Sequence, residues 1–181
     1  MRVAITGVPG VGKTSVCRGL QGFAVVNFGD FMFEIAKETF NIKNRDEMRK
    51  KLSVSDYVRL QKIAGRRISE MENVVVDTHC SVELHGGYYP GLPSHLLKTM
   101  KLDALIVIEA DVRDIVERRK KDAGIRQRSL DEEDVRRHQE MNRYYAAACS
   151  ELSGVPVFFV KNRHGKLEET IEEVKKILNR L

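Results

Sequence analysis

Five short apolar runs recur along the chain, each rich in β-branched residues and each followed by polar or glycine-containing segments. The runs cover residues 2–6, 23–27, 73–77, 104–109 and 155–160. Because they are continuously apolar and do not alternate in polarity, they predict strands buried on both faces, as in a parallel sheet. The longer segments between them carry helical patterns. This alternation predicts an α/β fold, a five-stranded parallel sheet with helices on both faces.

The helical pattern is clearest in two segments. In residues 53–71, apolar or small side chains recur at steps of three and four, at Tyr57, Leu60, Ala64, Ile68 and Met71. Ser53 and Asp56 favour a capped start for this helix. After Gly165 the same spacing recurs at Leu167, Ile171, Val174, Leu178 and Leu181. Further helices are expected over residues 111–121 and from residue 130, where Ser129 and Glu132 favour a cap.

Composition bounds the class of protein. With 181 residues and 42% hydrophobic content, the chain is expected to form a single domain, residues 1–181, without repeats or linkers. Its three cysteines are widely separated and lack a C-x-x-C spacing, which disfavours a zinc site or a disulfide framework and suits a reducing compartment. Neither a signal sequence nor an apolar run of about 20 residues is present, so a cytoplasmic protein is expected.

The first apolar run leads directly into a glycine-rich segment. Residues 7–14 match the phosphate-binding pattern G-x-x-x-x-G-K-[ST] at every fixed position. Glycines leave backbone N–H groups open to a polyphosphate, and the following helix directs its positive dipole end at the anion. The pattern predicts a P-loop NTPase-type three-layer fold that binds ATP; an ordinary glycine-rich turn is the alternative. The predicted triphosphate ligands are Gly7, Val8, Pro9, Gly10, Val11, Gly12, Lys13, Thr14 and Ser15.

A magnesium site is expected beside this loop. The run 73–77 ends in Asp77, at the edge where open α/β sheets bind their ligands. Mg²⁺ prefers hard oxygen ligands, so Thr14 and Asp77 are the predicted metal ligands, partly through water. A loop-capping role for Asp77 is the alternative, and Glu109 is a weaker second candidate. A lone histidine such as His79 is not expected to be catalytic or to bind a metal.

A basic segment follows the fourth run. Between residues 118 and 128 lie six basic residues and one acid, while the whole chain has a net charge of +5. Guanidinium groups can stabilise the charge on a migrating phosphoryl group. The segment therefore predicts a lid over about residues 119–132, with Arg118, Arg126 and Arg128 acting together with Lys13 in catalysis. A solvated basic loop is the alternative, and Arg143 is a second-rank member of the lid site.

Between the second and third runs lies another basic helical region that could bind an acceptor, with Arg45, Arg49 and Arg59 among its arginines. At this point the chain resembles the archaeal type of adenylate kinase, within the small P-loop nucleoside monophosphate kinases. The resemblance covers nearly the whole length, and it is carried by residues 7–15, 26–34, 44–50, 61–66, 74–79, 87–93 and 140–143.

The resemblance implies transfer of the terminal phosphate of Mg·ATP to AMP, with an AMP-binding insertion over about residues 29–72. The AMP-binding residues it implies are Gly29, Phe33, Arg45, Arg49, Arg59, His79 and Tyr88. Asn162 is expected near the ATP adenine. Similarity to the archaeal group also implies a homo-oligomer, specifically a trimer. Neither a membrane nor a nucleic acid is an expected partner.

The chain departs from the bacterial and eukaryotic members of the group at two places. Phe33 stands where those enzymes carry an arginine, and residues 77–81 replace their Asp-Gly-Phe-Pro-Arg segment. Other residues must therefore bind the AMP phosphate. Two alternatives are a kinase of this fold that acts on another nucleoside monophosphate or a small hydroxylated metabolite, and a nucleotide-dependent switch in RNA or ribosome assembly.

Overall fold

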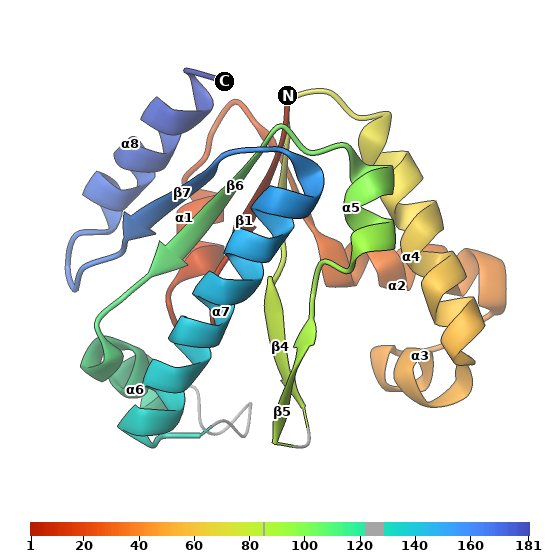
Figure 1. Ribbon diagram of the computed structural model, residues 1–181, viewed down its shortest axis with the longest axis horizontal. Coiled ribbons are helices and arrows are strands. Elements are labelled where there is room, and N and C mark those ends of the chain that lie inside the picture. The colour runs from red at the N-terminus through yellow and green to blue at the C-terminus, as the bar shows by residue number, and fades with distance from the viewer. Residues whose placement is uncertain (85, 122–128) are drawn as a thin grey trace.

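The computed structural model describes residues 1–84, 86–121 and 129–181, without the side chains of residues 46, 49, 50 and 84. Its main sheet has five parallel strands in the order β2-β3-β1-β6-β7 (Figure 1). The strands are β1 (Arg2–Thr6), β2 (Ala24–Asn27), β3 (Val74–Asp77), β6 (Ala104–Glu109) and β7 (Val157–Lys161). All five carboxyl ends therefore meet at one edge, where a ligand can be held by loops from several strands.

Alternate residues of the buried central strands enter two separate cores. Ala4, Val76 and Leu105 pack in one core with residues of α2 (Phe28–Phe40), α4 (Val54–Ser69), α5 (Ser94–Met100) and α7 (Glu132–Ser153). Val3, Val75 and Ile106 pack in the other with residues of α1 (Lys13–Arg18), α6 (Val112–Lys121) and α8 (Leu167–Leu178). The predicted fold, helices on both faces of a parallel sheet, is confirmed.

The helices between β2 and β3 form a group on one side of the sheet, which Figure 1 shows at the right. In this group α3 (Arg45–Lys51) follows α2, and α4 leads back to β3. Ser53 caps α4 as predicted, since its hydroxyl accepts the Asp56 N–H at 3.1 Å. Leu60, Ala64 and Ile68 are buried, so the predicted face of α4 is the face that packs.

Several expectations were wrong in detail. The strand β2 is not buried on both faces, because it lies at the edge of the sheet and Ala24, Val25 and Asn27 are exposed. Leu181 does not line the terminal helix, which ends at Leu178; Leu181 is 47% exposed. The cap of α7 is Asp131, whose carboxylate accepts two backbone N–H groups that the predicted Ser129 does not reach.

A β-hairpin follows β3 that the apolar pattern did not predict. It consists of β4 (Ser81–Leu84) and β5 (Gly87–Pro90), paired antiparallel, and Figure 1 shows it projecting beyond the carboxyl edge of the sheet. The hairpin lies against α7, where Asn142 Oδ1 accepts hydrogen bonds from the backbone N–H and the hydroxyl of Ser81. No helix among the described residues is long and apolar enough to cross a membrane.

Candidate active site

The glycine-rich segment forms the turn between β1 and α1, at the carboxyl edge of the sheet. Gly10 and Gly12 have positive φ angles of 96° and 91°, a conformation that side chains disfavour. A Cβ on Gly12 would also lie 2.4 Å from the side-chain amide of Asn162, and one on Gly7 would lie 2.5 Å from the Ile108 carbonyl. The chain's own packing therefore requires these glycines, in addition to any need to admit a phosphate.

Lys13 and Asp77 form a buried ion pair in the site. Lys13 Nζ lies 2.6 Å from Asp77 Oδ1, and the two residues are 8% and 5% exposed. The other carboxylate oxygen, Oδ2, accepts a hydrogen bond from Asn27 Nδ2 at 3.1 Å. Sheet order brings these groups together, because Asn27 and Asp77 are opposite each other in the β2–β3 register and β1 lies on the other side of β3.

These residues fit a magnesium–nucleotide complex. The structure shows that Asp77 Oδ1 already holds a cation, the Lys13 ammonium, at 2.6 Å. The hydroxyl-bearing Thr14 is exposed, one residue further along α1. Among the described residues no cluster of three or more His, Cys, Asp or Glu could hold a metal by itself. A single carboxylate and a hydroxyl suit Mg²⁺, which usually takes its remaining oxygens from phosphates and water.

Two arginines of α6 and Asn162 brace the glycine-rich segment from the side of β6 and β7. Arg118 Nη1 donates to the Val11 carbonyl at 2.9 Å, and Asn162 Nδ2 donates to the same oxygen at 2.7 Å. Arg119, only 4% exposed, donates from Nε to the Pro9 carbonyl at 3.0 Å and from Nη1 to the Ser129 carbonyl at 2.8 Å. Arg119 thus ties the segment to the chain just before α7.

His79 lies on the opposite side of the glycine-rich segment. Its Nδ1 is 3.0 Å from the Gly7 carbonyl, which can only accept, so Nδ1 carries the proton. Burial, followed by the positive charge of Lys13, lowers the pKa of His79 to about 4. The imidazole is therefore neutral near pH 7 and does not add to the positive charge of the site.

This pKa predicts a loss of stability in acid. The unfolded chain protonates His79 near pH 6.5, whereas the folded protein resists protonation down to about pH 4, so the nucleotide-free protein should lose up to about 3 kcal/mol as the pH falls through that window. Denaturant unfolding between pH 7.5 and 4.5 measures the effect. His79→Asn should reduce the loss, because Asn does not titrate in this range and still provides a donor for Gly7. His164→Asn, at an exposed position, is the matched control and should not. Equal profiles for the two variants would contradict the prediction.

The predicted acceptor residues divide into two places. Gly29 lies in the first turn of α2, and Arg45 Nη1 forms an ion pair with neighbouring Asp30 at 2.9 Å. Arg59 instead lies over the ring of Phe40, the last residue of α2. Phe40 is eleven positions after Gly29 in α2, a rise of about 16 Å. Gly29 and Arg45 are thus brought together near Asn27, and Arg59 is not placed beside them.

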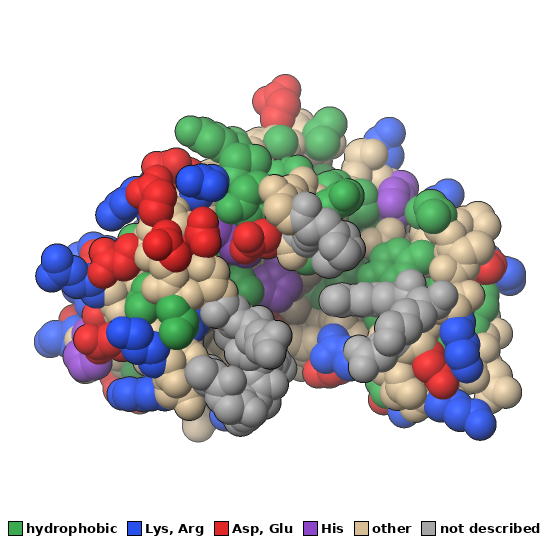
Figure 2. Space-filling view, turned by 90° about the horizontal axis from the view of Figure 1, so that it is seen from below, with side chains coloured by type: hydrophobic (Ala, Val, Ile, Leu, Met, Phe, Trp, Pro, Cys, Tyr) green, Lys and Arg blue, Asp and Glu red, His purple; other side chains and the backbone are tan. Residues whose placement is uncertain are grey.

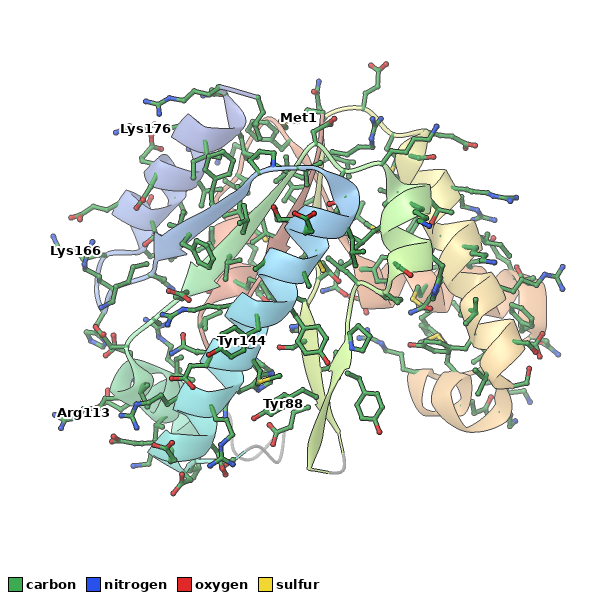
Figure 3. The ribbon with its side chains drawn as sticks, in the orientation of Figure 1. Met1, Tyr88, Arg113, Tyr144, Lys166 and Lys176 are labelled. Carbon is green, nitrogen blue, oxygen red and sulfur yellow. The ribbon has the colours of Figure 1, made fainter. Side chains whose placement is uncertain are left out.

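The remaining acceptor candidates are spread more widely. The ring of Phe33 lies 4.9 Å from Lys37 Nζ. Tyr88 lies on the hairpin beside α7, where its carbonyl accepts from the Tyr145 hydroxyl at 2.7 Å and its ring lies 5.2 Å from that of His138 (Figure 3). The Arg49 side chain is outside the described part of the structure.

The predicted lid is only partly within the described residues. Arg126 and Arg128 lie outside them, so their positions relative to the glycine-rich segment stay a prediction. The weaker candidates Glu109 and Arg143 pair with each other, with Arg143 Nη2 donating to Glu109 Oε2 at 2.9 Å. This pairing neutralises both charges.

Figure 2 views the molecule onto the carboxyl edge of the sheet. It shows a hollow between the side that carries α6 and α7 and the side that carries α2–α4, with histidine at the bottom of the hollow.

Two residues that sequence reasoning did not assign contribute to this site. Asn27 could have been noticed, because a helix-capping residue directly ends a strand. In the sequence, Arg119 could not be distinguished from its neighbour Arg118, because both are arginines in the same basic run. Their contacts differ because adjacent helical side chains lie about 100° apart around the helix.

Comparison with known proteins places this geometry in context. A family model described as an AAA domain matches residues 6–137. The chain is 46% identical to an adenylate kinase of Thermoplasma volcanium, over 98% of this chain and 99% of that protein. It is 42% identical to an adenylate kinase of Methanopyrus kandleri, over 94% of each. Among solved structures, a shikimate kinase from Acinetobacter baumannii in complex with shikimate has a TM-score of 0.64 over 99% of this chain and 93% of that one. At 12% identity this likeness shows the fold alone.

Proposed function

The chain carries an AAA domain and belongs to the adenylate kinase family, and from this premise we propose that it transfers the terminal phosphate of ATP to AMP, producing two ADP. The observation that carries the proposal is the meeting, at one sheet edge, of the glycine-rich segment, the Lys13–Asp77 pair and the Arg45–Asp30 pair that joins the starts of α3 and α2. The glycine-rich segment with Lys13 suits a triphosphate, and the side formed by α2 and α3 suits a monophosphate.

The chemistry requires alignment more than proton removal. An AMP phosphate oxygen is anionic near neutral pH and can attack without a general base, so His79, whose pKa of about 4 makes it a weak base, need not accept a proton. Lys13 is proposed to exchange Asp77 for the terminal phosphates of ATP. Arg118 is proposed to stabilise the charge on the migrating group, with Arg126 and Arg128 of the lid adding to it. Backbone N–H groups of residues 7–15, Pro9 excepted, are proposed to hold the phosphates, and Asn162 supports the segment through Val11.

Magnesium is the proposed cofactor. When bound, it would neutralise phosphate charge and orient the terminal group for in-line attack. Thr14 and Asp77 are the residues proposed to hold it, in part through water. Once Lys13 turns to the phosphates, Asp77 Oδ1 becomes free for this purpose, while Asn27 still engages Oδ2.

The acceptor is proposed to bind over the start of α2, beside Arg45, and this placement predicts the effect of Gly29→Ala. A Cβ at Gly29 would lie 2.0 Å from Arg45 Nη2, so the half-exposed guanidinium must move. We expect the KM for AMP to rise about tenfold with kcat little changed, because a charged hydrogen bond to the acceptor is lost.

Stability should be unchanged or increased by Gly29→Ala, since alanine favours a helix and a flexible side chain can yield. Steady-state kinetics with AMP varied measures the effect, and Arg45→Ala should produce a similar defect that does not add to it. A loss of stability with an unchanged KM would contradict this acceptor site.

The function is tested by measuring ADP formation from Mg·ATP with AMP, CMP, UMP, GMP or shikimate as acceptor. Rapid, AMP-dependent ADP formation supports the proposal. Preference for another acceptor would reassign the chain within the same fold, and tight salt-dependent RNA binding with negligible ADP formation would overturn the proposal. A cytoplasmic location and the homo-oligomer that the resemblance implies stay predictions; light scattering on the eluting protein measures the subunit number.

A further inference from the structure

We propose that Asn27 is a positioning residue that presents Asp77 to the metal and couples it to the acceptor-binding helix α2, an inference that rests on the proposed function. Asn27 ends β2 and caps α2 at the same time. Its two polar atoms point in different directions. Oδ1 accepts the Asp30 N–H at 3.1 Å, and Nδ2 donates to Asp77 Oδ2 at 3.1 Å.

The orientation of this amide is determined by its partners. A backbone N–H can only donate and an ionised carboxylate can only accept, so the oxygen must face Asp30 and the nitrogen must face Asp77. Aspartate or serine would serve as well for the helix cap, since both accept a hydrogen bond from the backbone. Among common capping residues, asparagine also supplies a donor long enough to reach Asp77.

The two oxygens of Asp77 consequently have different roles. Oδ2 is engaged by Asn27, on the side of the acceptor-binding helix, and Oδ1 is engaged by Lys13, on the side of the glycine-rich segment. When Lys13 turns to the phosphates of ATP, the Asn27 hydrogen bond keeps the carboxylate in place with Oδ1 directed at the metal position. Groups that orient a metal ligand in this way commonly affect metal affinity or activity 10- to 100-fold.

The same residue connects the two halves of the site. Lys13 contacts Asp77, Asp77 contacts Asn27, Asn27 caps α2 at Asp30, and Asp30 pairs with Arg45 at the start of α3. A displacement of α2 when AMP binds would therefore be felt at Asp77. Occupation of the acceptor site should in turn depend on the state of the metal site.

The test uses Asn27→Ser, which keeps the cap and the charge but cannot reach Asp77. Calorimetry with ATP, in the presence and absence of Mg²⁺, measures how much magnesium strengthens nucleotide binding. We expect this enhancement to fall about tenfold in the variant, with metal-free ATP affinity within about twofold of wild type. In the kinetic assay kcat should fall and the magnesium requirement should rise, and the KM for AMP should depend less on the magnesium concentration than in wild type.

Asn44→Ser is the matched control. Asn44 caps α3 through Oδ1, which accepts the Glu47 N–H at 2.9 Å. The control makes the same chemical change at a second helix cap, and we expect it to retain the full magnesium enhancement. A second variant, Asn27→Asp, keeps both the cap and the side-chain length but faces Asp77 with a like charge. It should show a lower kcat than wild type even if Asn27→Ser folds poorly.

The outcomes separate this inference from the proposed function. If wild type shows no magnesium enhancement of ATP binding, Asp77 is not a metal ligand, and the magnesium site on which the proposed function depends is wrong. If wild type shows the enhancement and both Asn27 variants retain it, Asn27 is a helix cap only and the inference is overturned. A loss confined to the Asn27 variants supports it.

Discussion

Replacing Lys13 with methionine is expected to abolish most turnover and, separately, to destabilise the nucleotide-free protein. The substitution removes a buried cation 2.6 Å from the Asp77 carboxylate, which is only 5% exposed, with little change in volume. Leaving one member of a buried ion pair without its partner costs about 3–5 kcal/mol. Denaturant unfolding without nucleotide measures this loss.

The loss of turnover has a different cause. The ammonium group is the proposed cation for the terminal phosphates, and removing one such preorganised group from a transition state costs about 10²–10³ in kcat. The double variant Lys13→Met with Asp77→Asn distinguishes the two effects. It removes both charges, so it should recover much of the stability and none of the activity. A single variant as stable as wild type would show that the Lys13–Asp77 pair does not stabilise the fold.

Replacing Arg118 with alanine is expected to cause the second large loss of kcat. Its guanidinium lies beside the glycine-rich segment, donating to the Val11 carbonyl at 2.9 Å, and it is the described arginine proposed to meet the migrating phosphoryl group. Arginines in this role contribute about 10³-fold or more to kcat. We expect a fall of at least about a hundredfold in kcat, with a much smaller change in the Kd for ATP.

Arg113 provides a matched control for Arg118. Arg113 lies on the same helix, is 87% exposed and points away from the molecule (Figure 3). Arg113→Ala removes the same charge and should leave kcat within about twofold of wild type, because Arg113 pairs with Glu132 only at 4.0 Å among the described residues and exposed ion pairs contribute little. Arg118→Lys should restore little activity, since an ammonium cannot replace a planar fork. Equal kcat values for Arg118→Ala and Arg113→Ala would remove Arg118 from the catalytic group.

The β4–β5 hairpin shows where reading the sequence failed. Tyr88 and Tyr89 lie between glycine and Pro90, and a proline at the end of so short a run argues against a strand. The hairpin forms because α7 stabilises it, through Asn142 bonded to Ser81 and Tyr145 bonded to the Tyr88 carbonyl. A two-stranded hairpin is marginal by itself, so contacts from a helix distant in the sequence decide the outcome.

The glycine-rich segment, the five strands and the acid at the end of β3 were predictable from the sequence, because each depends on neighbours within a few residues. The partners within the site were not. Lys13 and Asp77 are 64 residues apart, and Asn27 and Asp77 are 50 apart. Their contacts follow from the strand order β2-β3-β1, which local periodicity does not encode. Tertiary structure alone decided that Asp77 holds Lys13 and Asn27, because only sheet assembly aligns the three carboxyl ends.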